Sequence, residues 1–279
     1  MDKKTFKRWN LIVAAVVTII AGATYLSTIE PTASFWDCGE FIASSYKLEV
    51  GHPPGNPVFQ LIARFFTIPI PPEKAAVAVN AMNGIISALT IFFLYLTLVF
   101  FAQRLIKPKN GEYTLAQAIA IFGSGAVGGL VYTFSDTFWF SAVEGEVYAM
   151  SSLFTALVFW IMCKWYEDAD KPHSGRWIVL IALLMGLSIG VHLLNLLTIP
   201  AFVFMYYYRK NEDRKLPFKK LLGIFMIGVV IEFLIVFIFI PLFPKLAAFF
   251  DRIFVNGFHL PYNTGALFFL VAVLALCFW

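Results

Sequence analysis

The chain has 279 residues, of which 60% are hydrophobic and only 14% are charged. A typical soluble domain carries about 25% charged and about 45–50% apolar residues. This composition excludes an ordinary soluble domain and predicts an all-α polytopic membrane protein. The formal net charge of +4 says little by itself, because the side of the membrane on which basic residues lie matters more than their sum. The three cysteines show no CxxC spacing, so neither a disulfide framework nor a zinc site is predicted.

Basic residues open the chain, and a long apolar run follows them. Four Lys and Arg residues within positions 1–10 precede the 19-residue run Leu11 to Ile29. Secretory signal peptides have the same order, and Ala21-Gly22-Ala23 resembles a cleavage site. The run is nevertheless long enough to cross a bilayer. We therefore predict a retained first membrane helix with its N-terminus in the cytoplasm.

Residues 30–74 form the predicted first outer loop. The segment Ser34-Phe-Trp-Asp37 has the pattern of a capping box, so we expect a short interfacial helix to begin there. The prolines of His52-Pro-Pro-Gly55 are expected to break this helix. A second short helix is predicted over Pro57 to Thr67, before a further cluster of prolines.

Three further apolar segments before residue 170 are predicted to span the membrane. They are Ala75 to Phe101, Leu115 to Phe134 and Val147 to Trp165. The third span of the chain contains the letters GxGxxG, but a dinucleotide site needs a preceding strand, and none is expected. We interpret Gly125 and Gly129 instead as a GxxxG pair that lets another helix approach closely.

Residues 177–208 are uncharged apart from the titratable His192, and too long for one span. Six basic residues follow within positions 209–220. A hairpin of two short helices keeps those residues in the cytoplasm, as the positive-inside tendency favours. Each arm of about 16 residues reaches roughly 24 Å, which is short of the ~30 Å hydrocarbon core. We therefore expect the tip, residues 190–195, to line a cavity.

The remaining sequence is predicted to span the membrane from Leu221 to Phe243, to lie outside over residues 244–262, and to re-enter over residues 263–279. The sequence stops inside an apolar run. We therefore expect residues 1–279 to form one membrane domain of a longer protein.

Asp37 and Glu40 are the strongest candidates for chemistry. A carboxylate beside the membrane can act as a general base or hold a divalent cation. Each acid also has a structural interpretation, because acids near a helix N-terminus stabilise the helix, and Asp37 would be the acid at position N3 of the capping box. No metal ligand is assigned, and no cofactor is predicted beyond such a cation.

Six further polar residues on the predicted outer side are candidates for substrate binding: His52, Arg64, Glu146, Tyr148, His192 and Asn195. Arg64 suits phosphate oxygens, although an interfacial arginine can equally reach lipid headgroups. Glu144 is interpreted as structural, because Ser141-Ala-Val-Glu144 forms a second capping box. Since these candidates lie on one side and not near the bilayer midplane, they indicate a surface site rather than a transport path.

The runs SFWDCGEF (34–41) and GHPPG (51–55), with GEVYAM (145–150) and GVHLLN (190–195), resemble the protein O-mannosyltransferases of the GT-C class. They are still closer to a bacterial family catalogued without a function, which resembles an animal transmembrane O-mannosyltransferase. The resemblance implies a GT-C bundle of membrane helices with surface-lying loop helices and an active site between them.

The resemblance also implies the reaction. A sugar, with mannose expected, moves from a polyprenyl-phosphate donor to a Ser or Thr hydroxyl of an exported protein, with inversion and with Asp37 as the base. The expected location is a bacterial inner membrane with the site on the outer, periplasmic face, and no nucleic acid is involved. A transporter or flippase of a lipid-linked sugar and a non-catalytic membrane scaffold remain alternatives.

Overall fold

The computed structural model describes residues 1–211 and 216–278, which contain helices and no β-strand. Among these described residues, five helical segments are long and apolar enough to cross a membrane: Lys3–Ser27, Pro72–Leu105, Leu115–Thr133, Val147–Asp168 and Phe218–Phe258. This confirms the prediction of an all-α polytopic membrane protein. The chain divides into two compact units, Met1–Thr198 and Ile199–Trp279, and the single domain expected over 1–279 stays a prediction.

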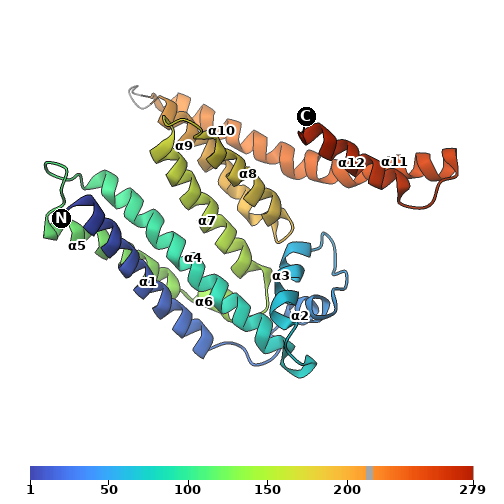
Figure 1. Cartoon of the computed structure of the whole chain (residues 1–279), viewed down its shortest axis with the longest axis horizontal. Coiled ribbons are helices and arrows are strands. Elements are labelled where there is room, and N and C mark those ends of the chain that lie inside the picture. The colour runs from blue at the N-terminus through green and yellow to red at the C-terminus, as the bar shows by residue number, and fades with distance from the viewer. Residues whose placement is uncertain (212–215, 279) are drawn as a thin grey trace. The chain divides into compact units, whose positions relative to one another are not determined.

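The first unit contains eight α-helices and two 3-10 turns (Figure 1). The α-helices are α1 (Lys3–Ser27), α2 (Cys38–Lys47), α3 (Pro57–Thr67), α4 (Ala75–Leu105), α5 (Leu115–Thr133), α6 (Asp136–Val143), α7 (Val147–Asp168) and α8 (Gly175–Ile189). The 3-10 turns are Pro72–Lys74 and Leu193–Thr198. The spans predicted at α4, α5 and α7 and the short helix predicted at α3 are confirmed, the last with identical bounds.

Helix α4 lies at the centre of this bundle and packs against α1, α5 and α7. It is apolar around its whole circumference, as expected of a helix enclosed by others. Tyr95 and Ile91 of α4 are fully buried in a core shared with α1 and α5. The Tyr25 hydroxyl of α1 donates to the Thr133 carbonyl at 3.0 Å, which ties α1 to the end of α5.

The predicted close approach at Gly125 and Gly129 is confirmed. A Cβ atom on Gly125 would lie 2.8 Å from Val99 Cγ2 of α4, and one on Gly129 would lie 3.2 Å from Val17 Cγ1 of α1. Side chains at these positions would push the helices apart, so the two glycines set the spacing of α5 from its neighbours.

Short helices cover one end of the bundle. Helices α2 and α3 pack on each other and on the start of α4 (Figure 1). The core at this end includes Phe41 of α2, Phe59 of α3, and Val79 and Met82 of α4. This packing holds the first loop against the helix ends that carry the acids of the α6–α7 connection.

The second unit is also helical: α9 (Ile199–Lys210), α10 (Phe218–Leu234), a π-helical turn (Ile235–Phe239), α11 (Ile240–Phe258) and α12 (Thr264–Phe278). Residues 244–258 are helical as part of α11, and their expected place outside the membrane stays a prediction. The π-helical turn inserts one extra residue per turn just before the prolines, so the helical path continues through Pro244. The buried Asp251 carboxylate then accepts a hydrogen bond from the Gly265 N–H at 3.1 Å, at the start of α12.

The predicted break in residues 177–208 is confirmed. Helix α8 ends at Ile189, and the chain turns through residues 190–192. The second arm begins as the 3-10 turn Leu193–Thr198 rather than as an α-helix. The Gly190 carbonyl accepts from the Val58 N–H at 2.8 Å, so the tip contacts the first turn of α3.

Candidate functional site

Asp37 lies directly before α2, and its side chain does not cap this helix. The predicted capping box at Ser34–Asp37 is wrong, because α2 begins at Cys38 and Asp37 takes the N-cap position with no side-chain bond to the helix. Trp36 has a positive φ of 61°, which excludes it from a right-handed helix. Within residues 1–211 and 216–278 no group bonds or ion-pairs with the exposed Asp37 carboxylate.

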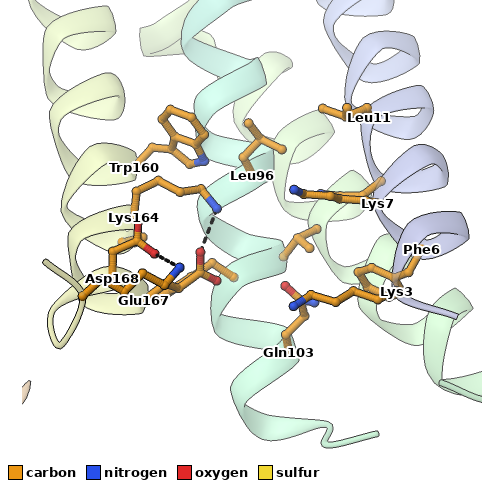
Figure 2. Close-up of a pocket in the computed structure, with 15 residues that line it drawn as sticks. Lys3, Phe6, Lys7, Leu11, Leu96, Gln103, Trp160, Lys164, Glu167 and Asp168 are labelled. Carbon is orange, nitrogen blue, oxygen red and sulfur yellow. Dashed lines mark hydrogen bonds and ion pairs between the residues drawn. The ribbon is translucent and has the colours of Figure 1, made fainter. Parts of the chain in front are cut away.

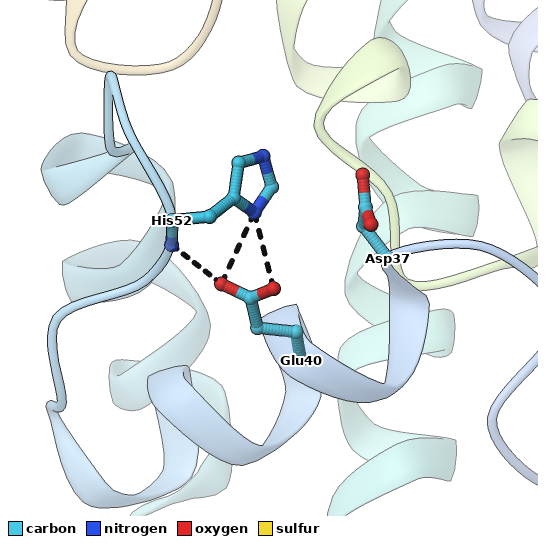
Figure 3. Close-up of side chains that lie close together, drawn as sticks. All are labelled: Asp37, Glu40 and His52. Atoms are coloured by element: carbon cyan, nitrogen blue, oxygen red, sulfur yellow. Dashed lines mark hydrogen bonds and ion pairs between the residues drawn. The ribbon is translucent and has the colours of Figure 1, made fainter.

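Glu40 and His52 form a pair across the first loop (Figure 3). Helix α2 ends at Lys47, before the HPPG turn, because its C-cap Leu48 has a positive φ of 55°. The expectation that the prolines break this helix is therefore wrong. The chain then folds back over α2. One Glu40 oxygen accepts from the His52 N–H at 2.6 Å, and the two oxygens each lie 3.1 Å from His52 Nδ1.

This pairing moves the protonation equilibria of both side chains. The backbone and side-chain hydrogen bonds from His52 lower the pKa of Glu40 below its ordinary value. The hydrogen bond to Glu40 and the charge of its carboxylate raise the pKa of His52. Each effect favours the charged form, so the pair is an ion pair over a wider pH range than isolated side chains would be.

Two buried acids come from the connection between α6 and α7. Glu146 is the N-cap of α7, and its carboxylate accepts from the Val147 N–H at 3.1 Å. Glu144 is extended, beyond the end of α6, and lies 3.7 Å from Cys38 Sγ. The predicted capping box at Ser141–Glu144 is therefore wrong. Burial raises the pKa of Glu144, and it raises the pKa of Glu146 to about 7.

Two asparagines of α4, which the sequence reasoning missed, hold these loops in place. Both are fully buried near the start of the helix. The Asn83 amide donates to the carbonyls of Glu144 and Glu146, at 2.6 Å each. The Asn80 amide donates to the carbonyls of Glu30 at 2.6 Å and Thr32 at 3.0 Å. The available signal was two amides three residues apart on one face of a membrane helix.

A cavity of about 290 Å³ joins the first loop, the start of α7 and the turn after α8. Five of the predicted site residues line it: Asp37, His52, Glu146, Tyr148 and His192. The rings of Tyr148 and His192 lie 5.4 Å apart, centre to centre. The structure thus brings together candidates that are up to 155 positions apart in the sequence.

Asn56 is a cavity residue that the sequence reasoning missed. It is 5% exposed and lines the cavity. Neither its amide nitrogen nor its amide oxygen has a hydrogen-bond partner among the described residues. A buried amide without partners is costly, so this group is suited to bind a polar ligand. Its position directly after the HPPG turn was the available signal.

Three other predicted residues lie outside the wall of this cavity. Glu40 reaches it only through His52. The Arg64 guanidinium donates to the Tyr46 carbonyl at 2.5 Å and lies over the Tyr46 ring. The buried Asn195 amide donates to Ser188 Oγ at 2.9 Å. The roles predicted for these residues in substrate binding or catalysis stay predictions.

A family model described as the Protein O-mannosyl-transferase TMEM260 N-terminal domain matches residues 37–215. The chain belongs to this TMEM260 family. The matched region begins at Asp37 and contains all eight predicted site residues.

Curated relatives carry the same family name. A protein O-mannosyl-transferase tmem260 of Dictyostelium discoideum is 26% identical over 217 residues, which cover 72% of this chain and 24% of the relative. Protein O-mannosyl-transferase TMEM260 of Mus musculus is 24% identical over 181 residues, which cover 65% of this chain and 23% of the relative. The TMEM260-family chain thus aligns with only about a quarter of each. No solved structure matches it.

One group of side chains in this TMEM260-family site has the composition of a metal site. Ligand atoms of Asp37, Glu40 and His52 all lie within 4.8 Å of one another. Carboxylate oxygens with one imidazole nitrogen suit a divalent cation of intermediate hardness. The Glu40 carboxylate is already bonded to His52, so a cation bound by all three residues would have to replace that contact.

Proposed function

We propose that this chain forms the catalytic membrane region of a protein O-mannosyltransferase of the GT-C class. It transfers mannose from a polyprenyl-phosphate donor to a Ser or Thr hydroxyl of a protein acceptor. Family membership and the names of the relatives support the reaction class. The observation that carries the proposal is the unengaged carboxylate of Asp37 on the wall of a cavity built from three separate parts of the first unit.

Asp37 acts as the general base in this proposal. Its carboxylate takes the proton of the acceptor hydroxyl as that oxygen attacks the anomeric carbon from the face opposite the lipid phosphate. The bond between the anomeric carbon and the phosphate oxygen breaks, and its electron pair leaves with the polyprenyl phosphate. The anomeric configuration inverts. A single base suffices because the activated donor has a leaving group that needs no proton, unlike the substrates of inverting hydrolases, which require a second carboxyl group.

His52 supplies positive charge beside the base. Its contact with Glu40 raises the pKa of the imidazole, so the ring stays protonated to higher pH than a free histidine. An imidazolium on the cavity wall suits the phosphate of the donor and the negative charge that develops there as the bond breaks. Glu40 therefore acts through His52, as a positioning and charge-setting residue.

The other cavity residues suit recognition of a sugar. The Asn56 amide offers a donor and an acceptor, neither of which has a partner among the described residues. Tyr148 and His192 provide adjacent rings on the same wall. Burial raises the pKa of Glu146 to about 7, so near neutral pH this carboxyl can donate to or accept from a sugar hydroxyl.

We infer that the cavity faces the periplasm of a bacterial inner membrane. The opposite helix ends of the first unit carry the basic residues Lys3, Lys7, Arg104 and Lys164. Positive charge of this kind marks the cytoplasmic side. Labelling of single cysteines in intact cells tests this. A cysteine at Val50 is expected to react with a membrane-impermeant reagent and one at His173 is not, and the reverse pattern would refute the orientation.

Transfer by the purified chain tests the function. We would incubate it with labelled polyprenyl-phosphate mannose and a pool of Ser/Thr peptides, and expect labelled glycopeptide. Asp37→Asn keeps the shape of the side chain but removes the base, so the rate should fall about 10²- to 10⁴-fold. Asp136→Asn is the matched control, because Asp136 is an exposed acid in the first turn of α6 and does not line the cavity.

The result of the transfer assay decides between the proposed function and its alternatives. A wild-type rate in Asp37→Asn would refute the assignment of the base. Movement of the labelled lipid across proteoliposomes without any glycopeptide would favour the transporter or flippase alternative. If neither transfer nor movement occurs with any acceptor, the proposed activity of the chain is refuted.

A further inference from the structure

A second and larger cavity lies at the other end of the first unit. Its volume is about 760 Å³, and it is bordered by the start of α1 and the ends of α4 and α7 (Figure 2). Helix α7 reaches both cavities, with Val147 in the first and Lys164 in the second. The 17 residues between them correspond to about 26 Å along the helix. The second cavity is thus separate from the proposed active site.

Positive charge collects at the mouth of this cavity. Two of the lysines that line it are paired with acids: Lys164 of α7 with Glu167 at 2.9 Å, and Lys171, just after α7, with Asp168 at 2.6 Å. Lys3 and Lys7 of α1 also line the cavity. No carboxylate within the described part of the chain lies within ion-pair distance of either. These two charges also stand in the first turns of α1, where the helix dipole is positive.

The cavity becomes apolar along the helices. Leu11 lies eight residues beyond Lys3 on α1, or about 12 Å deeper. Leu96 of α4 and Trp160 of α7 line this apolar part of the cavity (Figure 2). A cationic mouth above an apolar floor matches an amphiphile with an anionic head. Tryptophan is enriched at the level where the headgroups meet the hydrocarbon.

We propose that this cavity binds an anionic phospholipid of the surrounding bilayer. Its phosphate contacts Lys3 and Lys7, and its upper acyl chains pack on Leu11 and Leu96. Basic pockets between membrane helices are suited to such headgroups. A free phosphate ion would leave the apolar floor uncovered, so the lipid is the occupant that fits.

Binding to the purified, lipid-depleted chain tests this directly. We would add phosphatidylglycerol or phosphatidylcholine in detergent and count retained lipids by native mass spectrometry. The chain is expected to retain phosphatidylglycerol selectively. The double variant Lys3→Gln/Lys7→Gln should bind it about thirtyfold more weakly, since each lysine near a lipid surface contributes about fivefold. The matched control Lys47→Gln/Lys74→Gln removes two exposed lysines near the first loop and should bind normally.

Two further measurements keep the test decisive. Inorganic phosphate in excess should not displace the lipid, and displacement would overturn the lipid assignment in favour of a small-anion site. If the double variant does not fold, wild-type binding is titrated with salt, and retention of phosphatidylglycerol must fall as ionic strength rises. Equal retention of both lipids, an unaffected double variant or salt-independent binding would each overturn the proposal.

Discussion

Replacement of Glu146 by glutamine should make the folded protein more stable, and only above mildly acidic pH. Glu146 is 6% exposed, and its burial raises the pKa of the carboxyl from 4.5 to about 7. Between these values the folded state binds more protons than the unfolded state. The free energy of unfolding therefore falls as pH rises from about 4.5 to about 7. Above about pH 7 the stability lost by ionising the buried carboxyl no longer increases, and this loss is the penalty considered below.

The size of the penalty follows from the shift. About 2.5 pH units at about 1.36 kcal/mol per unit give an upper limit of about 3 kcal/mol. Glutamine keeps the shape of the side chain and can still accept from the Val147 N–H, but it carries no charge. Glu146→Gln should thus be more stable than the wild type by up to about 3 kcal/mol above pH 7, and nearly equal to it near pH 4.5.

Thermal unfolding in detergent at a series of pH values measures this difference. The melting temperatures of variant and wild type should coincide near pH 4.5 and diverge by several degrees by pH 8. Glu73→Gln, at an exposed acid in the 3-10 turn before α4, is the matched control and should leave the pH dependence unchanged. A constant offset between Glu146→Gln and the wild type across the pH series would refute the reasoning, because a buried, titrating carboxylate cannot produce it.

Three further predictions concern the site and its supports. Glu40→Gln removes the charge that raises the pKa of His52. In a plot of kcat/KM for transfer against pH, the fall at alkaline pH should therefore move to lower pH. An unchanged alkaline fall would contradict the role of the pair. Asn83→Ala removes two hydrogen bonds to the loop carbonyls of Glu144 and Glu146, although the Glu144 carbonyl keeps the Glu146 N–H as a donor. It should destabilise the protein by about 1–3 kcal/mol in thermal unfolding, and a loss below about 0.5 kcal/mol would show that the loop has other supports. Gly125→Val should prevent folding because α5 closely approaches α4 at this position. Gly123→Val, with no atom within 4 Å of its Cβ position, should yield monodisperse protein in gel filtration. Equal yields of the two variants would refute the packing argument.

Hydropathy and helix punctuation predicted much of the fold. The segment predicted over Leu115–Phe134 is α5, Leu115–Thr133, and the segment predicted over Pro57–Thr67 is α3. These features depend on the local sequence, because a bilayer selects apolar runs of a certain length and proline defines helix ends. Proline does not mark a helix end at Pro244, which lies inside α11 after the π-helical turn Ile235–Phe239.

The two predicted capping boxes are wrong. A loop side chain can bond either the backbone close to it in sequence or a group that is distant in sequence. Both predicted capping boxes are absent, because the acids of those segments take part in other contacts or in none. The acid at the fourth residue of a capping-box pattern can cap a helix, bond a distant N–H or face a cavity. The pattern alone does not distinguish these cases. The amides of Asn80 and Asn83 decide the paths of the acid loops, and their partners are 48 to 63 residues away in sequence.

The sequence by itself determined the membrane helices from hydropathy, and the close packing at Gly125 and Gly129 from the spacing of small residues. It also indicated Asp37, Glu40 and His52 as candidate residues from the motifs of the first loop. Each of these features depends on a short local pattern. Only the tertiary structure decided which candidates share a cavity. It joined Asp37 to Glu146 and His192, left Arg64 and Asn195 in other contacts, and revealed Asn56. The physical reason is that a cavity is made by the packing of helix ends that are distant in sequence, and no short pattern encodes which side chains remain unbonded there.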